Sequence, residues 1–121
     1  MRILVCGGRD FKDQHKVNLV LDGLQMKHNH IFIIEGGAIG ADRLAQNWAK
    51  EIHGIIPEFV NYKTFKADWG THGKAAGPIR NQQMIDEGKP DLVVAFPGGA
   101  GTADMVRRAK KAGIEVREVT Y

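Results

Sequence analysis

The sequence contains no serine and a single cysteine, and both facts restrict its chemistry. Without serine, the chain has no seryl nucleophile for acyl-enzyme catalysis. Cys6 cannot form an internal disulfide, which favours a reducing compartment, and its place in an apolar run favours buried packing over reactivity. No apolar run approaches the ~20 residues of a membrane span, and the amino-terminal residues match a strand pattern rather than a signal peptide. We therefore expect a cytoplasmic protein with no membrane partner.

Aromatic residues and net charge are also scarce. The chain has five Phe, two Trp and two Tyr, and its formal net charge is only +3. Single-stranded nucleic acid requires a basic groove with aromatic platforms, so this composition disfavours nucleic acid as a partner. The five histidines show no tight ligand spacing, which predicts neither a metal site nor a metal cofactor. The mild positive charge suits a small anionic ligand instead.

Glycine, in contrast, is abundant, with 15 residues in a chain of 121. The glycines gather at residues 7–8, 36–40, 70–77 and 98–101. Such clustering indicates loops that come close to another group. Three of the clusters follow short continuous apolar runs, at residues 3–6, 31–34 and 92–96. Continuous runs of this length are typical of parallel strands that are buried on both faces.

Helical periodicity separates these apolar runs. Apolar residues three and four positions apart predict helices at about residues 17–24, 41–52, 76–87 and 103–109. Gly54 and Gly113 stand where helix-ending glycines are expected. Further strands are expected at residues 59–60 and, on a sheet edge, at 114–119, with 62–77 as the longest irregular segment. The alternation predicts an α/β fold: one Rossmann-like three-layer domain over residues 1–121, with about five parallel strands and about four helices.

The glycine turns predict a phosphate site. In open α/β sheets, ligands bind at the carboxyl ends of the strands, and a glycine turn there exposes N–H groups at the positive end of a helix. We expect the third turn to hold the phosphate and Arg9 and Arg80 to neutralise it. The turn residues predicted to bind ligand are Gly7, Gly8, Arg9 and Asp10, then Gly36, Gly37, Gly40 and Asp42, then Pro97, Gly98, Gly99, Gly101 and Thr102.

The segment at residues 68–81 adds further ligand-binding candidates, namely Asp68, Trp69, Arg80 and Asn81. Either Asp42 or Asp68 would bind a ribose hydroxyl, and Trp69 would flank a base. Structural roles compete with these functions. Asp10 can cap the next helix, Asp42 can complement a helix dipole, and Trp69 can cover the core.

The ordered motifs resemble a known family. They are Gly7–Phe11, Gly36–Asp42, Ala67–Trp69, Ala76–Asn81 and Ala95–Thr102. Together they resemble the YspA-type, cpYpsA-related branch of the SLOG superfamily, over essentially the whole chain. That resemblance implies a Rossmann-like fold, a nucleotide-derived ligand and a homodimer.

The hydrolase branch of that superfamily carries Pro-Gly-Gly-x-Gly-Thr-x-x-Glu and an arginine from a separate helix. Residues 97–102 match this pattern, and Arg80 matches the arginine. Met105 stands at the glutamate position, and Asp104 lies one residue earlier, which rotates it by about 100° on a helix. The resemblance therefore implies Asp104 and Arg80 as candidate catalytic residues, with Asp104 displaced from the expected position.

Three functional hypotheses follow. The first is a nucleotide-binding protein that acts as a sensor, with no cofactor. The second is an enzyme that cleaves the N-glycosidic bond of a nucleotide, with a carboxylate of Asp104, Asp10 or Asp68 at the reacting centre. The third is a single-strand nucleic-acid binder, which the composition disfavours.

Overall fold

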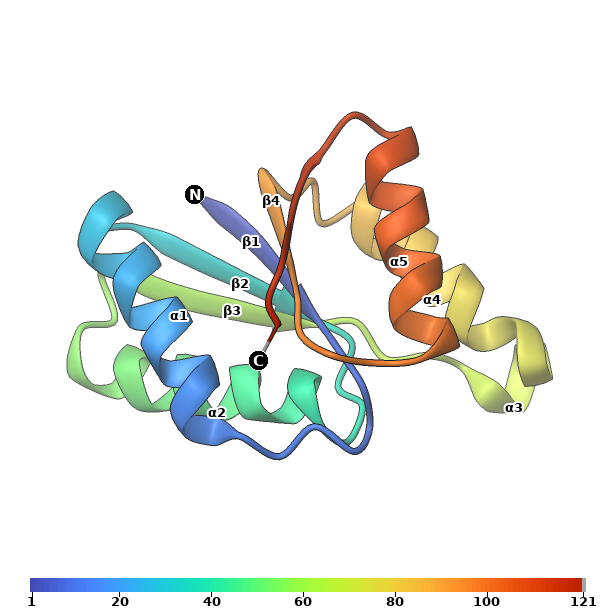
Figure 1. The fold of residues 1–121 in the computed structure, drawn as a ribbon, viewed down its shortest axis with the longest axis horizontal. Coiled ribbons are helices and arrows are strands. Elements are labelled where there is room, and N and C mark those ends of the chain that lie inside the picture. Colours follow the sequence, from blue (N-terminus) through green and yellow to red (C-terminus); the bar gives the residue numbers. More distant parts are fainter. Residues whose placement is uncertain (121) are drawn as a thin grey trace.

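The computed structural model describes residues 1–120 and shows an α/β fold with a five-stranded parallel sheet (Figure 1). The strand order is β3-β2-β1-β4-β5. The strands are β1 (Arg2–Cys6), β2 (Ile31–Glu35), β3 (Val60–Thr64), β4 (Leu92–Ala95) and β5 (Glu115–Glu118). The helices are α1 (Gln14–His28), α2 (Ala41–Ile55), α3 (Trp69–His72), α4 (Ala76–Asp86) and α5 (Ala100–Lys111), with a 3₁₀ turn, η1 (Gly73–Ala75), between α3 and α4. The predicted fold class is confirmed.

Burial explains the strand order. The apolar runs of β1, β2 and β4 occupy the centre of the sheet, where both faces are covered. The charged strand β5 lies on an edge and pairs only with β4 among the described strands, as its composition predicted. Helices α1 and α2 cover one face of the sheet and α4 and α5 the other (Figure 1). Each helix within residues 1–120 is too short or too polar to cross a lipid bilayer.

Two local predictions were wrong. The segment at residues 62–77 is largely regular: β3 continues to Thr64 by pairing with β2, and α3, η1 and the start of α4 occupy residues 69–77. Gly54 does not end a helix, because α2 continues to Ile55.

The alternative that Asp10 caps the helix after β1 is also wrong. Asp13, not Asp10, caps this helix, with its carboxylate accepting a hydrogen bond from the Lys16 N–H. Asp10 is therefore left exposed on the loop that follows β1, at the same end of the sheet as the other glycine turns.

The turns after β1 and β4 touch each other through their backbones. The Gly8 N–H donates a hydrogen bond of 2.8 Å to the Pro97 carbonyl. A Cβ on Gly98 would lie 2.6 Å from the Gly8 nitrogen and 2.2 Å from the Thr102 hydroxyl. Glycine at this position therefore allows the two turns to come together.

We predict that Gly98→Ala lowers the free energy of unfolding by about 1–3 kcal/mol, because the added methyl group overlaps backbone atoms that cannot move freely. Gly54→Ala is the matched control, since no atom lies within 4 Å of a Cβ there. It should stabilise α2 by about 0.5–1 kcal/mol. Urea denaturation measures both changes, and equal stabilities for the two variants would contradict the prediction.

Candidate functional site

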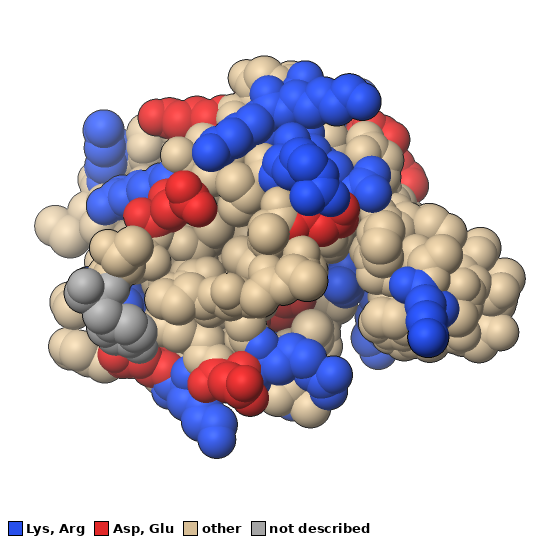
Figure 2. Space-filling model, turned by 45° about the vertical axis from the view of Figure 1, so that its right-hand side comes forward, with Lys and Arg blue, Asp and Glu red and all other residues tan. Residues whose placement is uncertain are grey.

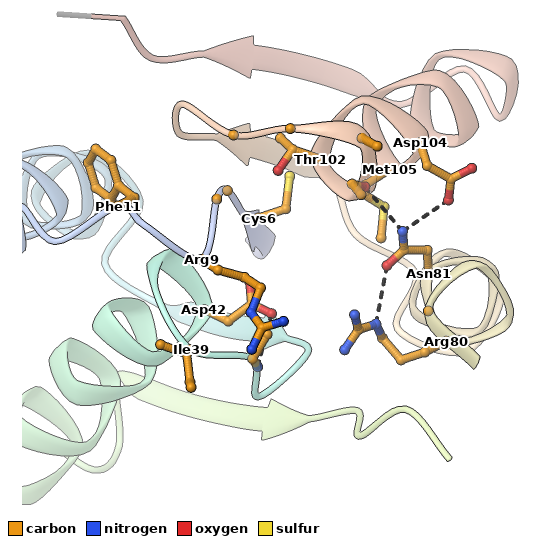
Figure 3. Close-up of a pocket in the computed structure, with 18 of the residues that line it drawn as sticks. Cys6, Arg9, Phe11, Ile39, Asp42, Arg80, Asn81, Thr102, Asp104 and Met105 are labelled. Carbon is orange, nitrogen blue, oxygen red and sulfur yellow. Dashed lines mark hydrogen bonds between the residues drawn. The ribbon is translucent and has the colours of Figure 1, made fainter. Parts of the chain in front are cut away.

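A cavity of about 1350 Å³ opens where the central strands reach their carboxyl ends (Figure 3). It exceeds the ~300–1,000 Å³ of a usual small-molecule pocket. We call this cavity the pocket. Its walls come from the turn after β1, the turn after β2, the start of α4, and the turn that leads into α5.

Most of the residues predicted to bind ligand line the pocket. The first two turns contribute Gly7, Gly8, Arg9, Asp10, Gly37 and Asp42, and the rest of the chain contributes Trp69, Arg80, Asn81, Pro97, Gly98, Gly99, Gly101, Thr102 and Asp104. Three predicted residues, Gly36, Gly40 and Asp68, are not part of the lining.

Gly36 and Gly40 support the pocket from outside. A Cβ on Gly40, whose φ is +95°, would lie 2.1 Å from the Gly8 carbonyl oxygen. A Cβ on Gly36 would lie 2.2 Å from Nη1 of Arg80. These two glycines make room for the neighbouring turn and for the guanidinium group, respectively.

Asp68 has a structural position. Its carboxylate accepts a hydrogen bond from the Thr71 N–H and so caps α3. Hydrogen bonds from Thr71 hold the pKa of this exposed carboxyl below its usual range.

The amino terminus of α5 faces the pocket and is uncapped. Gly99 is the N-cap residue and makes no side-chain capping bond, so the first N–H groups of the helix lack an intrahelical acceptor. A Cβ on Gly99 or on Gly101 would meet no atom within 4 Å. Neither glycine is therefore required by contacts within the described protein, and both leave space beside the positive end of the helix.

Two arginines extend into the pocket from different walls. Figure 3 shows the guanidinium groups of Arg9 and Arg80 pointing toward the same part of the pocket. Nη1 of Arg80 donates to the carbonyls of Gly36, at 2.7 Å, and Phe65, at 3.5 Å. The structure records no ion pair for Arg9 with any residue of the described chain. Two guanidinium groups so placed favour an anion between them.

Asp42 is a buried carboxyl group in the same pocket. It lies in the first turn of α2, is 7% exposed, and accepts a hydrogen bond of 3.3 Å from the Ala38 N–H. Burial raises the pKa of Asp42 to about 6; the positive charge of Arg80 opposes this rise and the negative charge of Glu35 adds to it. A perturbed carboxyl in a cleft is a frequent property of functional sites.

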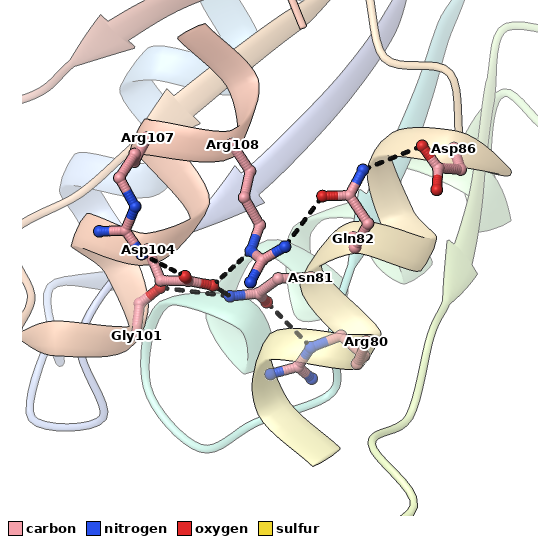
Figure 4. Close-up of polar contacts among 8 residues, drawn as sticks. All are labelled: Arg80, Asn81, Gln82, Asp86, Gly101, Asp104, Arg107 and Arg108. Atoms are coloured by element: carbon pink, nitrogen blue, oxygen red, sulfur yellow. Dashed lines mark hydrogen bonds and ion pairs between the residues drawn. The ribbon is translucent and has the colours of Figure 1, made fainter. Parts of the chain in front are cut away.

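Asp104 makes contacts within the protein on both carboxylate oxygens (Figure 4). Oδ1 accepts from Arg107 at 2.6 Å, and Oδ2 accepts from Arg108 at 2.8 Å and from Asn81 at 3.0 Å. Partial burial raises the pKa of Asp104, but the hydrogen bonds from Arg108 and Asn81 and the arginine charges outweigh it and hold the pKa below its usual value. Met105, at the glutamate position of the hydrolase-branch pattern, is 1% exposed and packs in the core.

Sequence reasoning missed Glu35. This side chain is fully buried beneath the second turn, where it accepts hydrogen bonds from the Gly37 N–H at 2.7 Å and from Gln46 and Thr64. Burial raises the pKa of Glu35, against the effect of these hydrogen bonds. The indication in the sequence was a charged residue that directly follows an apolar run and precedes a glycine pair.

The structure also locates Trp69 and Cys6, for which the sequence left a structural role open. Trp69 is 61% exposed and lines the pocket, so the alternative that it covers the core is wrong. Cys6 is buried, and burial raises the pKa of its thiol to about 12, in agreement with a packing role. No group of three or more potential metal ligands occurs among residues 1–120.

Two comparisons identify similar proteins. The sequence profile of the YspA, cpYpsA-related SLOG family matches residues 1–72, which contain the first two glycine turns. The chain is also 38% identical over 122 residues to the Gene 61 protein of Mycobacterium phage D29, an alignment that covers 95% of this chain and 93% of that protein.

We predict that Asp42→Asn changes the pH dependence of stability. The folded-state pKa of Asp42 is raised from 3.8 to about 6, so the native state binds this proton more tightly than the unfolded state. Wild-type stability should therefore fall, relative to that of Asp42→Asn, as the pH rises from about 4 to about 6, by at most about 3 kcal/mol. Urea denaturation across this range measures the difference, and parallel profiles would contradict the prediction.

Proposed function

This chain belongs to the YspA, cpYpsA-related SLOG family, and from that membership we propose that it binds a phosphorylated, nucleotide-derived ligand in the pocket. A parallel Rossmann-like sheet in this family fits a nucleotide-related role. The observation that carries the proposal is the uncapped start of α5, where Gly99 and Gly101 leave open space. Backbone N–H groups at a positive helix end favour a phosphate.

The surrounding charges support the same ligand. Arg9 and Arg80 face the pocket, and Arg80 retains donors for an anion after its bonds to Gly36 and Phe65. Asp42 lies beside Arg80 and offers a carboxylate to a ribose hydroxyl, while the exposed Trp69 offers a face for a base. Phosphate, sugar and base would then each have a partner in one pocket.

Binding is favoured over catalysis at Asp104. Its two oxygens already bond to Arg107, Arg108 and Asn81, and its lowered pKa disfavours proton donation at neutral pH. Met105 provides no carboxylate. We therefore propose that the protein retains the ligand unchanged, as a sensor would. From the family resemblance we also propose that it is a homodimer, and from its single cysteine that it acts in the reducing cytoplasm.

The surface charge supports a small ligand over nucleic acid. On the face shown in Figure 2, Lys and Arg side chains gather at the top with Asp and Glu side chains beside them, and elsewhere on this face the charged side chains of both signs lie scattered over uncharged surface. A single-strand binder requires a continuous basic groove with stacked aromatic rings.

The proposal is tested with Gly101→Ala. Native mass spectrometry of the purified protein, followed by a thermal-shift panel of nucleotides, selects the ligand. Gly101→Ala should weaken its binding about tenfold, because a methyl group enters the open space at the helix start. Stability should not fall, since alanine favours a helix by about 0.5–1 kcal/mol.

Gly54→Ala, near the end of α2 opposite to Asp42 and outside the pocket lining, serves as the control and should bind like the wild type. If no nucleotide in the panel binds or shifts the melting temperature of the wild type, the proposal fails. Unchanged affinity of Gly101→Ala would place the ligand away from α5.

A second candidate, hydrolysis of a nucleotide N-glycosidic bond, is favoured by one observation. Asp42 is a buried pocket carboxyl with a pKa of about 6, which suits general acid–base catalysis near neutral pH.

We predict that the wild type releases no free base from nucleoside monophosphates over many hours, as judged by chromatography. Release of base that Asp42→Asn lowers by about 100-fold, while Asp104→Asn retains it, would instead select hydrolysis with Asp42 at the reacting centre. The Asp104→Asn control distinguishes Asp42 from Asp104, the carboxylate that lies one residue before the glutamate position of the hydrolase-branch pattern.

A further inference from the structure

Asn81 lies between two walls of the pocket. It belongs to α4, is 6% exposed, and lines the pocket beside Arg80. Its side chain contacts residues of both α4 and α5 (Figure 4). It is one of three buried polar or charged side chains among the described residues, with Glu35 and Asp42.

The polarity of the Asn81 amide is fixed by its neighbours. Its Oδ1 accepts from Nε of Arg80 at 3.2 Å. Its Nδ2 donates to the Gly101 carbonyl at 3.3 Å and to Oδ2 of Asp104 at 3.0 Å. An amide has one acceptor atom and one atom with two donors, so the reversed orientation would oppose donor to donor and acceptor to acceptor.

The acceptor end orients the arginine. Asn81 holds Nε of Arg80, and the carbonyls of Gly36 and Phe65 hold Nη1. Because a guanidinium group is planar, two fixed nitrogens determine the position of the third. The structure records no hydrogen bond from Nη2 to the described part of the protein, so its two donors remain for a ligand.

The donor end holds the helix start. Gly101 lies in the first turn of α5, where the free N–H groups face the pocket. Asp104 lies one turn further and is itself held by Arg107 and Arg108. One side chain therefore connects the arginine of one wall to the helix terminus of the other.

We propose that Asn81 is a positioning residue that fixes the Arg80 guanidinium and the amino terminus of α5 relative to each other, so that both bind the same phosphate. This inference rests on the proposed function. Asn81 would affect ligand binding by holding Arg80 and Gly101 in place, and Asp104 would in turn hold Asn81.

Asn81→Asp tests whether residue 81 connects Arg80 to the start of α5, because the substitution keeps the shape of the side chain and replaces the NH₂ donor group by an oxygen. When ionised, the introduced carboxylate still accepts from Arg80 but repels the Gly101 carbonyl and the Asp104 carboxylate. When protonated, the introduced carboxyl group regains one donor. Burial and the neighbouring carboxylate of Asp104 favour the protonated form, while Arg80 and Arg108 oppose it.

The probe is AMP, with affinity measured by calorimetry for the variant and the wild type side by side. We expect the variant to bind AMP about tenfold more weakly than the wild type at about pH 7.5, and this loss to become smaller as the pH falls and the introduced carboxyl is protonated. Taking the ratio at each pH cancels the titration of the AMP phosphate. Circular dichroism at both pH values shows whether the variant is folded, so that recovery of affinity reflects positioning rather than refolding.

Gln82→Glu is the matched control. It makes the same amide-to-acid change one residue along α4, and Gln82 contacts Arg108 and Asp86 without lining the pocket. Its affinity ratio to the wild type should stay near one at both pH values.

The outcomes separate the inference from the proposed function. If neither AMP nor any panel nucleotide binds the wild type, the proposed function fails and the inference falls with it. If the wild type binds AMP but Asn81→Asp binds it equally well at both pH values, only the inference is overturned. An affinity loss that does not recover at acidic pH in a folded variant also overturns it.

If Asn81→Asp does not fold at neutral pH, the exchange variant Asn81→Asp with Asp104→Asn replaces it. This variant restores the hydrogen bond between positions 81 and 104 with its direction reversed, but it does not restore the bond to the Gly101 carbonyl. We expect it to fold and to bind AMP with a pH-independent affinity ratio, whereas loss of all AMP binding by the folded exchange variant would overturn the inference.

Discussion

The close contact between the turns after β1 and β4 determines the shape of the pocket. The Gly8 N–H bonds to the Pro97 carbonyl, and the Gly8 carbonyl accepts from the N–H groups of Phe11 and Ala41. This one peptide segment thus joins three turns that are far apart in the sequence. Side chains at Gly40 or Gly98 would separate them. Most glycines in these turns allow close packing, and among them only Gly99 and Gly101 have open space where a Cβ would lie.

A second constraint is the burial of charge beneath the second turn. Glu35 and Asp42 are both buried, and Arg80 extends from α4 to the carbonyl of Gly36 between them. Isolated charges are costly in such a place, but hydrogen bonds and the arginine compensate much of that cost. The pKa values of both carboxyls remain raised, so this compensation is incomplete, and a charge brought close to them would shift their protonation.

Much of the site was predictable because parallel strands end at the same edge of the sheet. The runs that became β1, β2 and β4 each end in glycines, so Gly7, Gly37 and Gly98 had to lie near one another. Side-chain partners were not predictable in this way. Asp68 was a candidate for a ribose hydroxyl and Asp104 a candidate catalytic carboxylate, yet Asp68 caps α3 and Asp104 bonds to Asn81 and two arginines. Thr71, Arg107 and Arg108 lie three or four positions from the carboxylates they contact, so local spacing allowed these partners without selecting them over a ligand. The contact of Asp104 with Asn81 joins segments that meet only in the fold.

The sequence by itself determined the sheet, its buried strands and the family, because apolar runs and glycine spacing are local and periodic. It also placed Met105 where a glutamate would otherwise stand. Only the tertiary structure decided which glycines pack and which remain open, because that depends on distances between turns. It alone decided that Asp42 is buried, that Trp69 is exposed and that Asn81 connects α4 to α5. Burial, exposure and the contacts of Asn81 all depend on which distant segments lie side by side, and that is settled only when the helices pack on the sheet.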